Sequence, residues 1–317
     1  MKDSYGRTIN YLRISVTDLC NLRCKYCMPE NGVVKKLHSE ILSIEEIECI
    51  VRAAAELGID KVRITGGEPL VRNGILEICR RIGAIGGLKE ICLTTNGVLL
   101  GDMAPELKKA GVSRVNISLD TLDPAKYAKI TRNGNLSDVF RGIQAARDVG
   151  LLPLKINTVL IGGFNDDEIG DFVELTRYEE IDVRFIELMP IGECVGWDEE
   201  CFIHSSRVLQ QESRLEPIAG KSAGVEMLYA IPGYQGRIGL INPMSQPFCE
   251  QCNRIRVTAD GKLKTCLHSS EEIDLKGLSY EAVKERITSA IQNKPLRHHL
   301  NEQAKSDSAR NMFQIGG

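Results

Sequence analysis

The stretch LRISVTDLCNLRCKYCMP, residues 12–29, joins a strand-like pattern to a loop that carries three cysteines. Residues 12–16 are apolar or β-branched at most positions, which favours a buried strand. Cys20, Cys24 and Cys27 follow in a Cys-x3-Cys-x2-Cys spacing. Three thiolates in one short loop can hold a face of a cuboidal four-iron cluster and leave one iron free to bind another molecule. A zinc site, or three unrelated core cysteines, is the alternative.

Strand-like and helix-like patterns alternate from this stretch to about residue 196. The strand patterns lie at residues 12–16, 61–65, 90–94, 114–119, 154–161 and 182–187. Between them, Ser43 and Glu46 form a capping box for a helix, and Asn165 or Asp166 is the expected cap of a later one. These alternations predict an incomplete parallel (β/α) barrel of about six strands, in which ligands gather at the C-terminal strand ends.

The pattern changes after Trp197, so we expect two parts, residues 1–196 and 197–317. Short strands at 226–231, 237–242 and 253–259 predict a small β-rich extension, followed by a helix near 280–292. The extension contains the second cysteine triplet.

That second triplet is Cys249, Cys252 and Cys266. By spacing alone it could belong to a zinc site with His268 as the fourth ligand. However, Arg254 and Arg256 project from one face of a strand between the cysteines. Two guanidiniums beside an iron with an open position favour an anion-binding site, because arginine binds phosphate in a bidentate manner.

Further cations alternate with apolar residues on the predicted strands: Arg13, Arg63, Lys155 and Arg184. An interior cation is costly unless it is paired or binds a ligand, so the set predicts a polyanionic substrate. The alternative is a set of salt bridges to nearby acids, namely Asp18, Glu68, Asp120 or Glu187.

Composition excludes several other classes of protein. The 40 basic and 43 acidic residues give a net charge of −3, and aromatic residues make up 5% of the chain, which argues against nucleic acid as a partner. No stretch is apolar enough for a signal peptide or a membrane span, so we expect a cytoplasmic protein. The eleven cysteines then indicate reduced thiols and metal ligation rather than disulfides.

The first loop, with Tyr26 before its third cysteine, and the turn Gly66-Gly67-Glu68-Pro69 together resemble the radical S-adenosylmethionine superfamily. This resemblance implies a 4Fe-4S cluster that cleaves S-adenosylmethionine to a 5′-deoxyadenosyl radical. By position it implies that Tyr26, Gly67, Ser118 and Met189 contact S-adenosylmethionine. Met189 could equally be core filler, and Ser118 could satisfy local backbone groups.

Over nearly the whole chain the motifs are similar to the GTP 3′,8-cyclases of molybdenum cofactor biosynthesis, which are lyases. That resemblance implies abstraction of the ribose 3′ hydrogen of GTP, attack of C3′ on guanine C8, and a second 4Fe-4S cluster that binds the guanine. It implies these GTP contacts: Arg13, Arg63, Thr94, Lys155, Arg254, Ile255 and Arg256.

The resemblance also assigns a catalytic role to the final glycines, Gly316 and Gly317, in a tail that reaches the active site. A frayed end is the alternative. It further implies an external electron donor, a homodimer, and a downstream cyclic pyranopterin monophosphate synthase that acts on the product. Two other functions remain open, a radical S-adenosylmethionine enzyme that modifies peptides and a zinc-binding scaffold protein.

Overall fold

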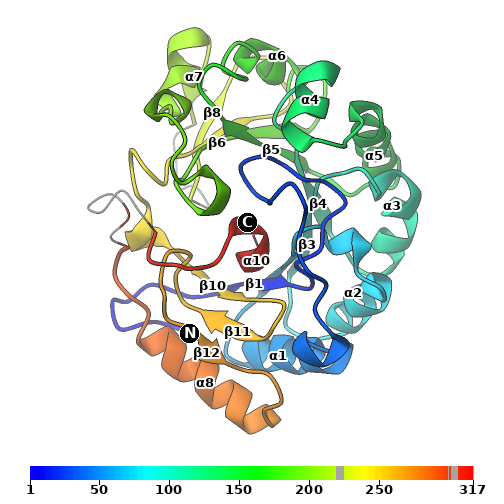
Figure 1. Cartoon of the computed structure of the whole chain (residues 1–317), viewed down its shortest axis with the longest axis vertical. Helices are drawn as coiled ribbons and strands as arrows, with labels where there is room; N and C mark the ends of the chain where they lie inside the picture. Colours follow the sequence, from blue (N-terminus) through cyan, green and yellow to red (C-terminus); the bar gives the residue numbers. More distant parts are fainter. Residues whose placement is uncertain (219–224, 299, 301–305, 317) are drawn as a thin grey trace.

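A single curved sheet forms the centre of the molecule in the computed structural model, which describes residues 1–218, 225–298, 300 and 306–316 (Figure 1). Its twelve strands run in the order β12-β11-β10-β1-β2-β3-β4-β5-β6-β9-β8-β7. Their bounds are β1 Tyr11–Ser15, β2 Lys61–Thr65, β3 Glu90–Thr95, β4 Arg114–Ser118, β5 Leu154–Leu160, β6 Ile181–Glu187, β7 Glu216–Pro217, β8 Met227–Ala230, β9 Ile238–Ile241, β10 Arg254–Val257, β11 Lys262–Lys264 and β12 Ile273–Asp274.

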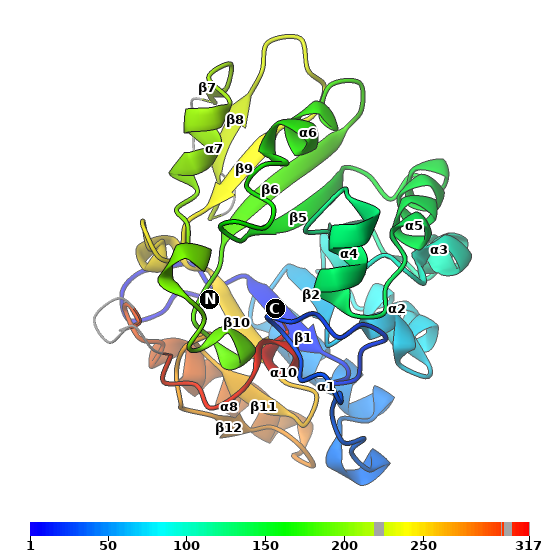
Figure 2. The ribbon, with the colours of Figure 1, turned by 45° about the horizontal axis from the view of Figure 1, so that its top comes forward.

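Helices cover the outer, convex face of this sheet, and the C-terminus lies inside the curve (Figures 1 and 2). The α-helices are α1 Ile44–Glu56, α2 Ile75–Gly83, α3 Leu100–Lys109, α4 Pro124–Thr131, α5 Leu136–Asp148, α6 Ile169–Glu174, α7 Ser206–Gln211, α8 Tyr280–Gln292 and α10 Met312–Ile315. Short 3₁₀ turns lie at η1 His38–Glu40, η2 Pro69–Val71, η3 Gly192–Cys194, η4 Glu199–Cys201 and η5 Cys249–Gln251. Among the described helices, none has the length and apolar character needed to cross a bilayer.

The predicted strands of the first 196 residues are present as β1–β6, and each pairs in parallel with its neighbour in sequence. The predicted small β-rich extension and the count of about six strands need correction, because the later strands continue the same twelve-stranded sheet. β9 pairs in parallel with β6, and β10 pairs in parallel with β1. The isolated strand patterns could not show that these segments, close in sequence, would extend opposite ends of the parallel region.

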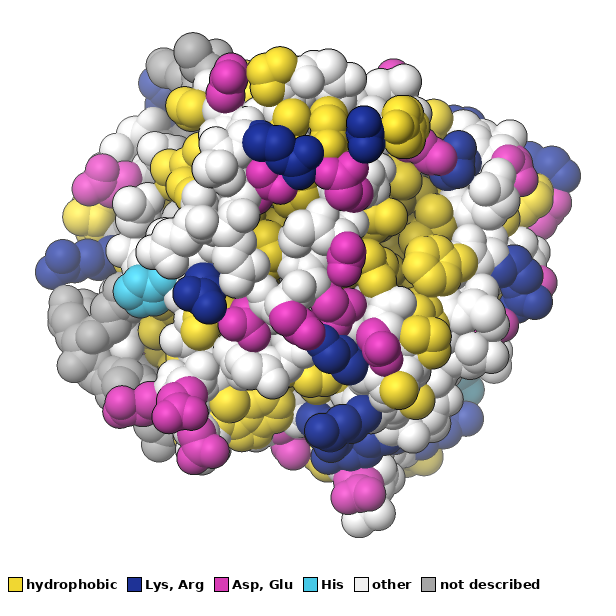
Figure 3. Space-filling model, turned by 90° about the horizontal axis from the view of Figure 1, so that it is seen from above, with side chains coloured by type: hydrophobic (Ala, Val, Ile, Leu, Met, Phe, Trp, Pro, Cys, Tyr) yellow, Lys and Arg dark blue, Asp and Glu magenta, His cyan; other side chains and the backbone are white. Residues whose placement is uncertain are grey.

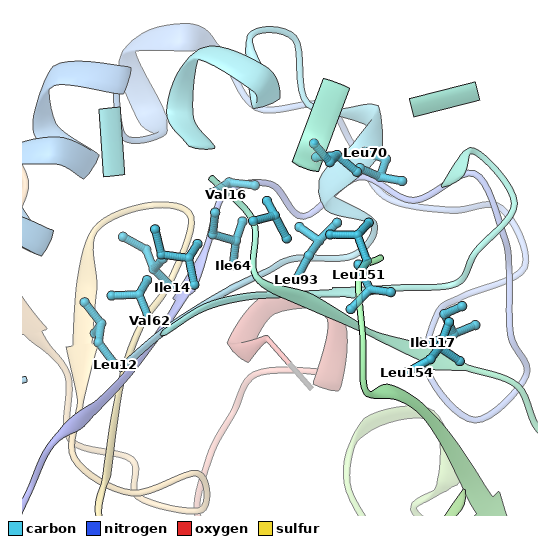
Figure 4. Packing of buried hydrophobic residues seen from close by; sticks show 14 of the residues in the cluster. Leu12, Ile14, Val16, Val62, Ile64, Leu70, Leu93, Ile117, Leu151 and Leu154 are labelled. Carbon is cyan, nitrogen blue, oxygen red and sulfur yellow. The ribbon is translucent and has the colours of Figure 1, made fainter. Parts of the chain in front are cut away.

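Alternation along the strands separates the core from the concave face. Leu12 and Ile14 on β1, with Val62 and Ile64 on β2, are fully buried beneath the outer helices (Figure 4). The residues between them therefore point to the inside of the curve, because successive strand side chains alternate in direction. This is how an apolar strand can place Arg13 in the interior.

Local helix signals were informative at one position and wrong at another. Ser43 and Glu46 form the predicted capping box at the start of α1, with hydrogen bonds of 3.1 and 2.8 Å. Asn165, predicted as a helix cap, instead donates to the carbonyls of Asp120 and Val159 and accepts from Ile161 N–H. Its amide therefore ties a loop to two strand ends, and α6 begins later, at Ile169.

Charges of both signs are interspersed on the face shown in Figure 3. This distribution agrees with the small net charge of the sequence.

Candidate active site

A cavity of about 460 Å³ lies on the concave side of the sheet. It is lined by all three cysteines of the second triplet and by six of the seven side chains predicted to contact the nucleotide, namely Arg13, Arg63, Thr94, Lys155, Arg254 and Arg256. The exception is Ile255, which is fully buried in the hydrophobic core because it alternates with its two arginine neighbours. Only the backbone of Ile255 can face the cavity.

Sheet register brings three of the arginines together. Arg13 on β1 pairs directly with Arg256 on β10 and with Arg63 on β2. The pKa of Arg13 is lowered far from its usual value by burial, and then by the charge of Arg256. Burial and neighbouring Arg254 likewise lower the pKa of Arg256 to about 10. These arginines crowd one another, which is the electrostatic signature of an anion site.

Two other cations do have acidic partners. Lys155 Nζ lies 3.0 Å from Asp182 and 3.7 Å from Glu226, and Arg184 donates to Glu226 at 2.7 Å. The salt-bridge alternative thus holds for Lys155 and Arg184, though with partners other than those suggested by the sequence.

The four suggested acids bind elsewhere. Asp18 pairs with Lys36 at 2.7 Å, and Asp120 accepts from the Tyr26 hydroxyl at 2.7 Å. Glu68 accepts hydrogen bonds from the backbone N–H of residues 70 and 96 and from the hydroxyl of residue 95. Glu187 accepts hydrogen bonds from the backbone N–H of residues 205, 244 and 245 and from the hydroxyl of residue 245.

Tyr11 is a cavity residue that sequence reasoning missed. Its hydroxyl accepts from Arg63 Nε, and its ring lies 5.1 Å from Lys61 Nζ and 5.5 Å from the Arg254 guanidinium carbon. Burial favours the neutral phenol, but Arg63, Arg13 and Arg254 outweigh it and lower the pKa of Tyr11 to about 8. Strand alternation could have identified Tyr11 and Lys61, since each lies two residues before an arginine of the cavity.

Some buried polar atoms of the cavity lining have no hydrogen-bond partner among the described residues. They are Arg184 Nε, Arg254 Nε and Asn157 Oδ1. Buried polar atoms normally have partners, so these atoms mark positions where a ligand would donate or accept. Arg254 Nε therefore marks a position for an acceptor of the ligand, such as an anionic oxygen, and Asn157 Oδ1 marks a position for a ligand donor.

The second cysteine triplet borders this cationic region. Burial would raise the pKa of Cys252, but Lys294 and Arg254 outweigh it and lower the pKa. Thiolates are the form that ligates metal, so nearby cations favour ligation. For His268, the candidate fourth zinc ligand, Nδ1 lies 3.3 Å from Ser306 Oγ, and the ring contacts that of His298 in a tilted arrangement with 4.6 Å between centroids.

The first triplet lies in a loop held by the segment between α4 and α5. Arg132 donates to the carbonyls of Arg23 at 2.8 Å and Met28 at 3.0 Å, and Arg23 N–H donates to Thr131. Burial raises the pKa of Cys20 to about 11 and that of Cys27 to about 12. A positive centre is thus needed for these thiols to become thiolates at neutral pH.

The Gly-Gly-Glu-Pro turn packs against the start of this loop. A Cβ on Gly67 would lie 2.5 Å from the Leu19 carbonyl oxygen and 2.7 Å from that of Asp18. Gly67 N–H donates to Thr17, and Glu68 N–H donates to Leu19. These glycines therefore allow the turn to approach the cysteine loop closely.

The other residues predicted to contact S-adenosylmethionine lie around this loop. Tyr26 is fixed through its hydroxyl to Asp120, while its carbonyl accepts from the Cys194 thiol at 3.6 Å. The same thiol also lies 3.2 Å from the Met189 carbonyl, and Met189 lines the cavity. Ser118 ends β4 on the same side of the sheet. Met189 therefore connects the region of the first triplet to the cavity of the second.

The C-terminal tail lies inside the curve of the sheet (Figure 1). Arg256 Nη1 donates to the carbonyls of Ile315 at 3.2 Å and Gly316 at 2.7 Å. Met312 lines the cavity, and the backbone N–H of Phe313 points to the Cys27 thiol. Gly316 therefore lies beside an arginine of the cavity lining, whereas Gly317 lies outside the described residues.

The thiols of each cysteine triplet lie close enough to interact electrostatically. Within the described part of the chain, no three His, Cys, Asp or Glu side chains converge as the ligands of one metal ion do. Yet the thiols of each triplet are near enough to raise one another's pKa, as Cys24 and Cys249 show. A cuboidal cluster takes its thiolates at separate corners, so both triplets fit such a cluster. All eleven cysteines are free.

Two family models cover most of the chain. The Radical SAM superfamily matches residues 14–176, and Molybdenum Cofactor Synthesis C matches residues 181–300. The GTP 3′,8-cyclase of Alkaliphilus oremlandii (strain OhILAs) is 54% identical over 320 residues, which is 100% of each chain. That of Peptoclostridium acidaminophilum is 55% identical over 320 residues, covering 99% of this chain and 98% of the other.

The chain belongs to the GTP 3′,8-cyclase family. Membership of the radical S-adenosylmethionine superfamily implies S-adenosylmethionine and 4Fe-4S clusters as cofactors. The fold is shared more widely. Streptococcus suis SuiB superposes with a TM-score of 0.60 at 14% identity, over 93% of this chain and 68% of the other. AdoMet-bound anSMEcpe gives 0.60 at 15% identity, over 96% and 89% of the two chains. At these identities the likeness concerns the fold alone.

Proposed function

We propose that the protein converts GTP to (8S)-3′,8-cyclo-7,8-dihydroguanosine 5′-triphosphate, as a lyase of molybdenum cofactor biosynthesis. One observation carries the proposal: a single cavity joins the second cysteine triplet to a row of arginines. A nucleoside triphosphate has one end that is strongly anionic and another that offers nitrogen and oxygen donors to iron. The two parts of the cavity match these two ends.

The strand cations would bind the triphosphate. Arg13, Arg63 and Arg256 lie in register, and Lys155 reaches the same cavity from β5. Thr94 accepts from Arg63 at 3.1 Å and thereby orients its guanidinium. Charge-assisted hydrogen bonds to phosphate are short and directional, so this row would fix the ribose as well as bind the nucleotide.

The two cysteine triplets would each hold a 4Fe-4S cluster. Cys20, Cys24 and Cys27 would ligate the one that binds S-adenosylmethionine, with Tyr26, Gly67, Ser118 and Met189 as its contacts. When bound, this cluster and S-adenosylmethionine supply a 5′-deoxyadenosyl radical, which can take the ribose 3′ hydrogen. Cys249, Cys252 and Cys266 would ligate the second cluster, whose open iron would bind the guanine.

The tail would close the site. Gly316 lies in the interior and is held by Arg256, one of the predicted nucleotide contacts. A seated tail would exclude water, which protects reactive carbon centres from side reactions. We therefore propose that Gly316 and Gly317 are needed for turnover and not for folding.

Partners follow from the chemistry of the family. An external reductant must deliver an electron to the first cluster. The product would pass to a cyclic pyranopterin monophosphate synthase. We also expect a homodimer, which size-exclusion chromatography with light scattering would test.

The test of function is anaerobic incubation of the reconstituted protein with S-adenosylmethionine, dithionite and either GTP or ATP. We expect 5′-deoxyadenosine and the cyclised nucleotide with GTP only. Formation of 5′-deoxyadenosine independent of GTP, without any cyclised nucleotide, would refute the substrate while leaving the superfamily assignment intact. A colourless protein with bound zinc would refute both and favour the scaffold alternative.

A further inference from the structure

The C-terminal tail is fastened to the sheet by a compact group of charges ahead of α10. Arg310 donates to both carboxylate oxygens of Asp260, each at 3.0 Å. It also donates to both oxygens of Glu272, at 2.5 and 2.7 Å. One guanidinium thus makes two bidentate contacts, which are the most directional ion pairs available to a protein.

These acids belong to the three strands at one edge of the sheet, β10, β11 and β12. Asp260 lies in the turn between β10 and β11, and Glu272 immediately precedes β12. Figure 2 shows the tail passing this edge before it turns into α10. Arg310 is 14% exposed at its side chain, and Asp260 and Glu272 are 22% and 24% exposed, so water screens the group only in part. Burial would raise the pKa of Asp260, but the hydrogen bonds from Arg310 and Thr258, with the charges of Arg310 and Lys36, together outweigh it and lower the pKa to about 2.

Asp260 is shared with the loop that follows the first cysteine triplet. Lys36 Nζ lies 3.5 Å from Asp260 and 2.7 Å from Asp18. Asp18 is 8% exposed and stands two residues before Cys20. Burial raises the pKa of Asp18, and Lys36 opposes that rise. A continuous chain of charges therefore runs from the tail to the base of the first cysteine loop.

Between Arg310 and Gly316, the last residue that the structure describes, the tail has few other polar anchors. The side chains of Phe313 and Ile315 are buried, and Arg256 donates hydrogen bonds to the carbonyls of Ile315 and Gly316. Chain ends fray unless something ties them down. A contact just before the buried residues has the greatest effect, because it reduces the conformational freedom that seating must overcome.

We propose that Arg310 is the positioning residue that seats the C-terminal tail, and that Asp260 couples this seating to the loop after the first cysteine triplet through Lys36. Arg310 touches neither reacting group and acts through the position of Gly316. The inference rests on the proposed function only for its effect on turnover. Seating itself is a property of the folded chain.

The test is hydrogen exchange in the anaerobically reconstituted protein, measured on the peptide from residue 306 to the C-terminus. Arg310→Gln should raise the exchange rate of this peptide about tenfold or more. Arg310→Lys keeps the charge but cannot make the bidentate hydrogen bonds of a guanidinium, so it should give an intermediate rise. Arg80→Gln is the matched control, since Arg80 is an exposed arginine on α2 that pairs with Glu77. Native exchange of the tail in Arg310→Gln would overturn the positioning role.

Lys36→Gln tests the coupling. It should raise exchange of the same tail peptide severalfold, and native exchange in this variant would overturn the link through Asp260. Native iron content and native circular dichroism establish that each variant is folded. Turnover should fall in proportion to the loss of tail protection, with the KM for S-adenosylmethionine unchanged. If native protein fails to cyclise GTP, the proposed function fails, while the exchange results still decide the role of Arg310.

Discussion

Gly316→Ala offers a sharp test of the tail, because the structure defines what the added methyl group would meet. Gly316 has φ of +68°, and an added Cβ would overlap Thr65 Oγ1 and lie 3.2 Å from Thr65 Cβ. Alanine pays about 1–2 kcal/mol for a left-handed backbone conformation. Overpacking in a rigid site adds about 1–3 kcal/mol. Thr65 is 2% exposed on β2, so it cannot move aside easily.

The sum is about 2–5 kcal/mol, which corresponds to a decrease of about 30-fold or more in the equilibrium constant for seating of the tail. We expect turnover of GTP to fall by at least that factor, with iron content and thermal stability close to native. The assay is product formation in the reconstituted protein, with tail protection measured in parallel by hydrogen exchange.

Gly163→Ala is the control for backbone conformation alone. Gly163 also has φ of +68°, but an added Cβ there would meet nothing within 4 Å. This variant should be slightly destabilised and fully active. Thr65→Ala combined with Gly316→Ala should recover part of the lost turnover, because it removes the overlapping hydroxyl. Native turnover and native tail protection in Gly316→Ala would refute the reasoning.

Three further predictions concern the cavity and the clusters. Lys155→Met should weaken GTP binding about 10- to 100-fold in anaerobic equilibrium binding, as expected for loss of a charged hydrogen bond, and unchanged GTP affinity would remove Lys155 from the site. The negative charge of a bound triphosphate should raise the pKa of Tyr11 from about 8, so the protein should take up about half a proton when it binds GTP at pH 8. Calorimetry in buffers of different ionisation enthalpy should show this uptake in native protein and not in Tyr11→Phe. Replacing Cys249, Cys252 and Cys266 by alanine should lower iron from about eight to about four per chain, with S-adenosylmethionine cleavage retained and cyclisation lost, and iron analysis with product chromatography would check both.

The inward-facing residues of the strands were predictable because they follow the two-residue period. Arg13, Arg63 and Lys155 interrupt apolar strands. Because their neighbours in sequence are buried on the outer face of the sheet, their own side chains must point to the concave face. The same rule moves Ile255 into the core. Tyr11 was missed because a tyrosine also fits an apolar core pattern, although its spacing of two residues from Arg13 places it on the cavity face.

Pairings between distant segments were not predictable. The sequence indicates Arg310 only as one charge in a polar tail, whereas its position beside Asp260 and Glu272 depends on how the sheet edge is built. In the same way, Asp182 and Glu226 meet Lys155 only once β5, β6 and the segment before β8 are assembled. Such contacts depend on tertiary structure, which a local pattern does not contain.

The placement of β9 and β10 has a consequence for how the protein matures. These strands are neighbours in sequence, yet they pair with β6 and β1 at opposite ends of the parallel region. Residues 242–253, which include Cys249 and Cys252, must therefore bridge the open side of the sheet. The first triplet lies in one short loop and the second flanks the local β10–β11 hairpin, whereas the cavity is complete only after β10 has paired with β1 and β9 with β6, which is the slower kind of folding event. The topology thus separates two events in maturation: each cysteine triplet comes together locally, and the substrate cavity forms only when the sheet is complete.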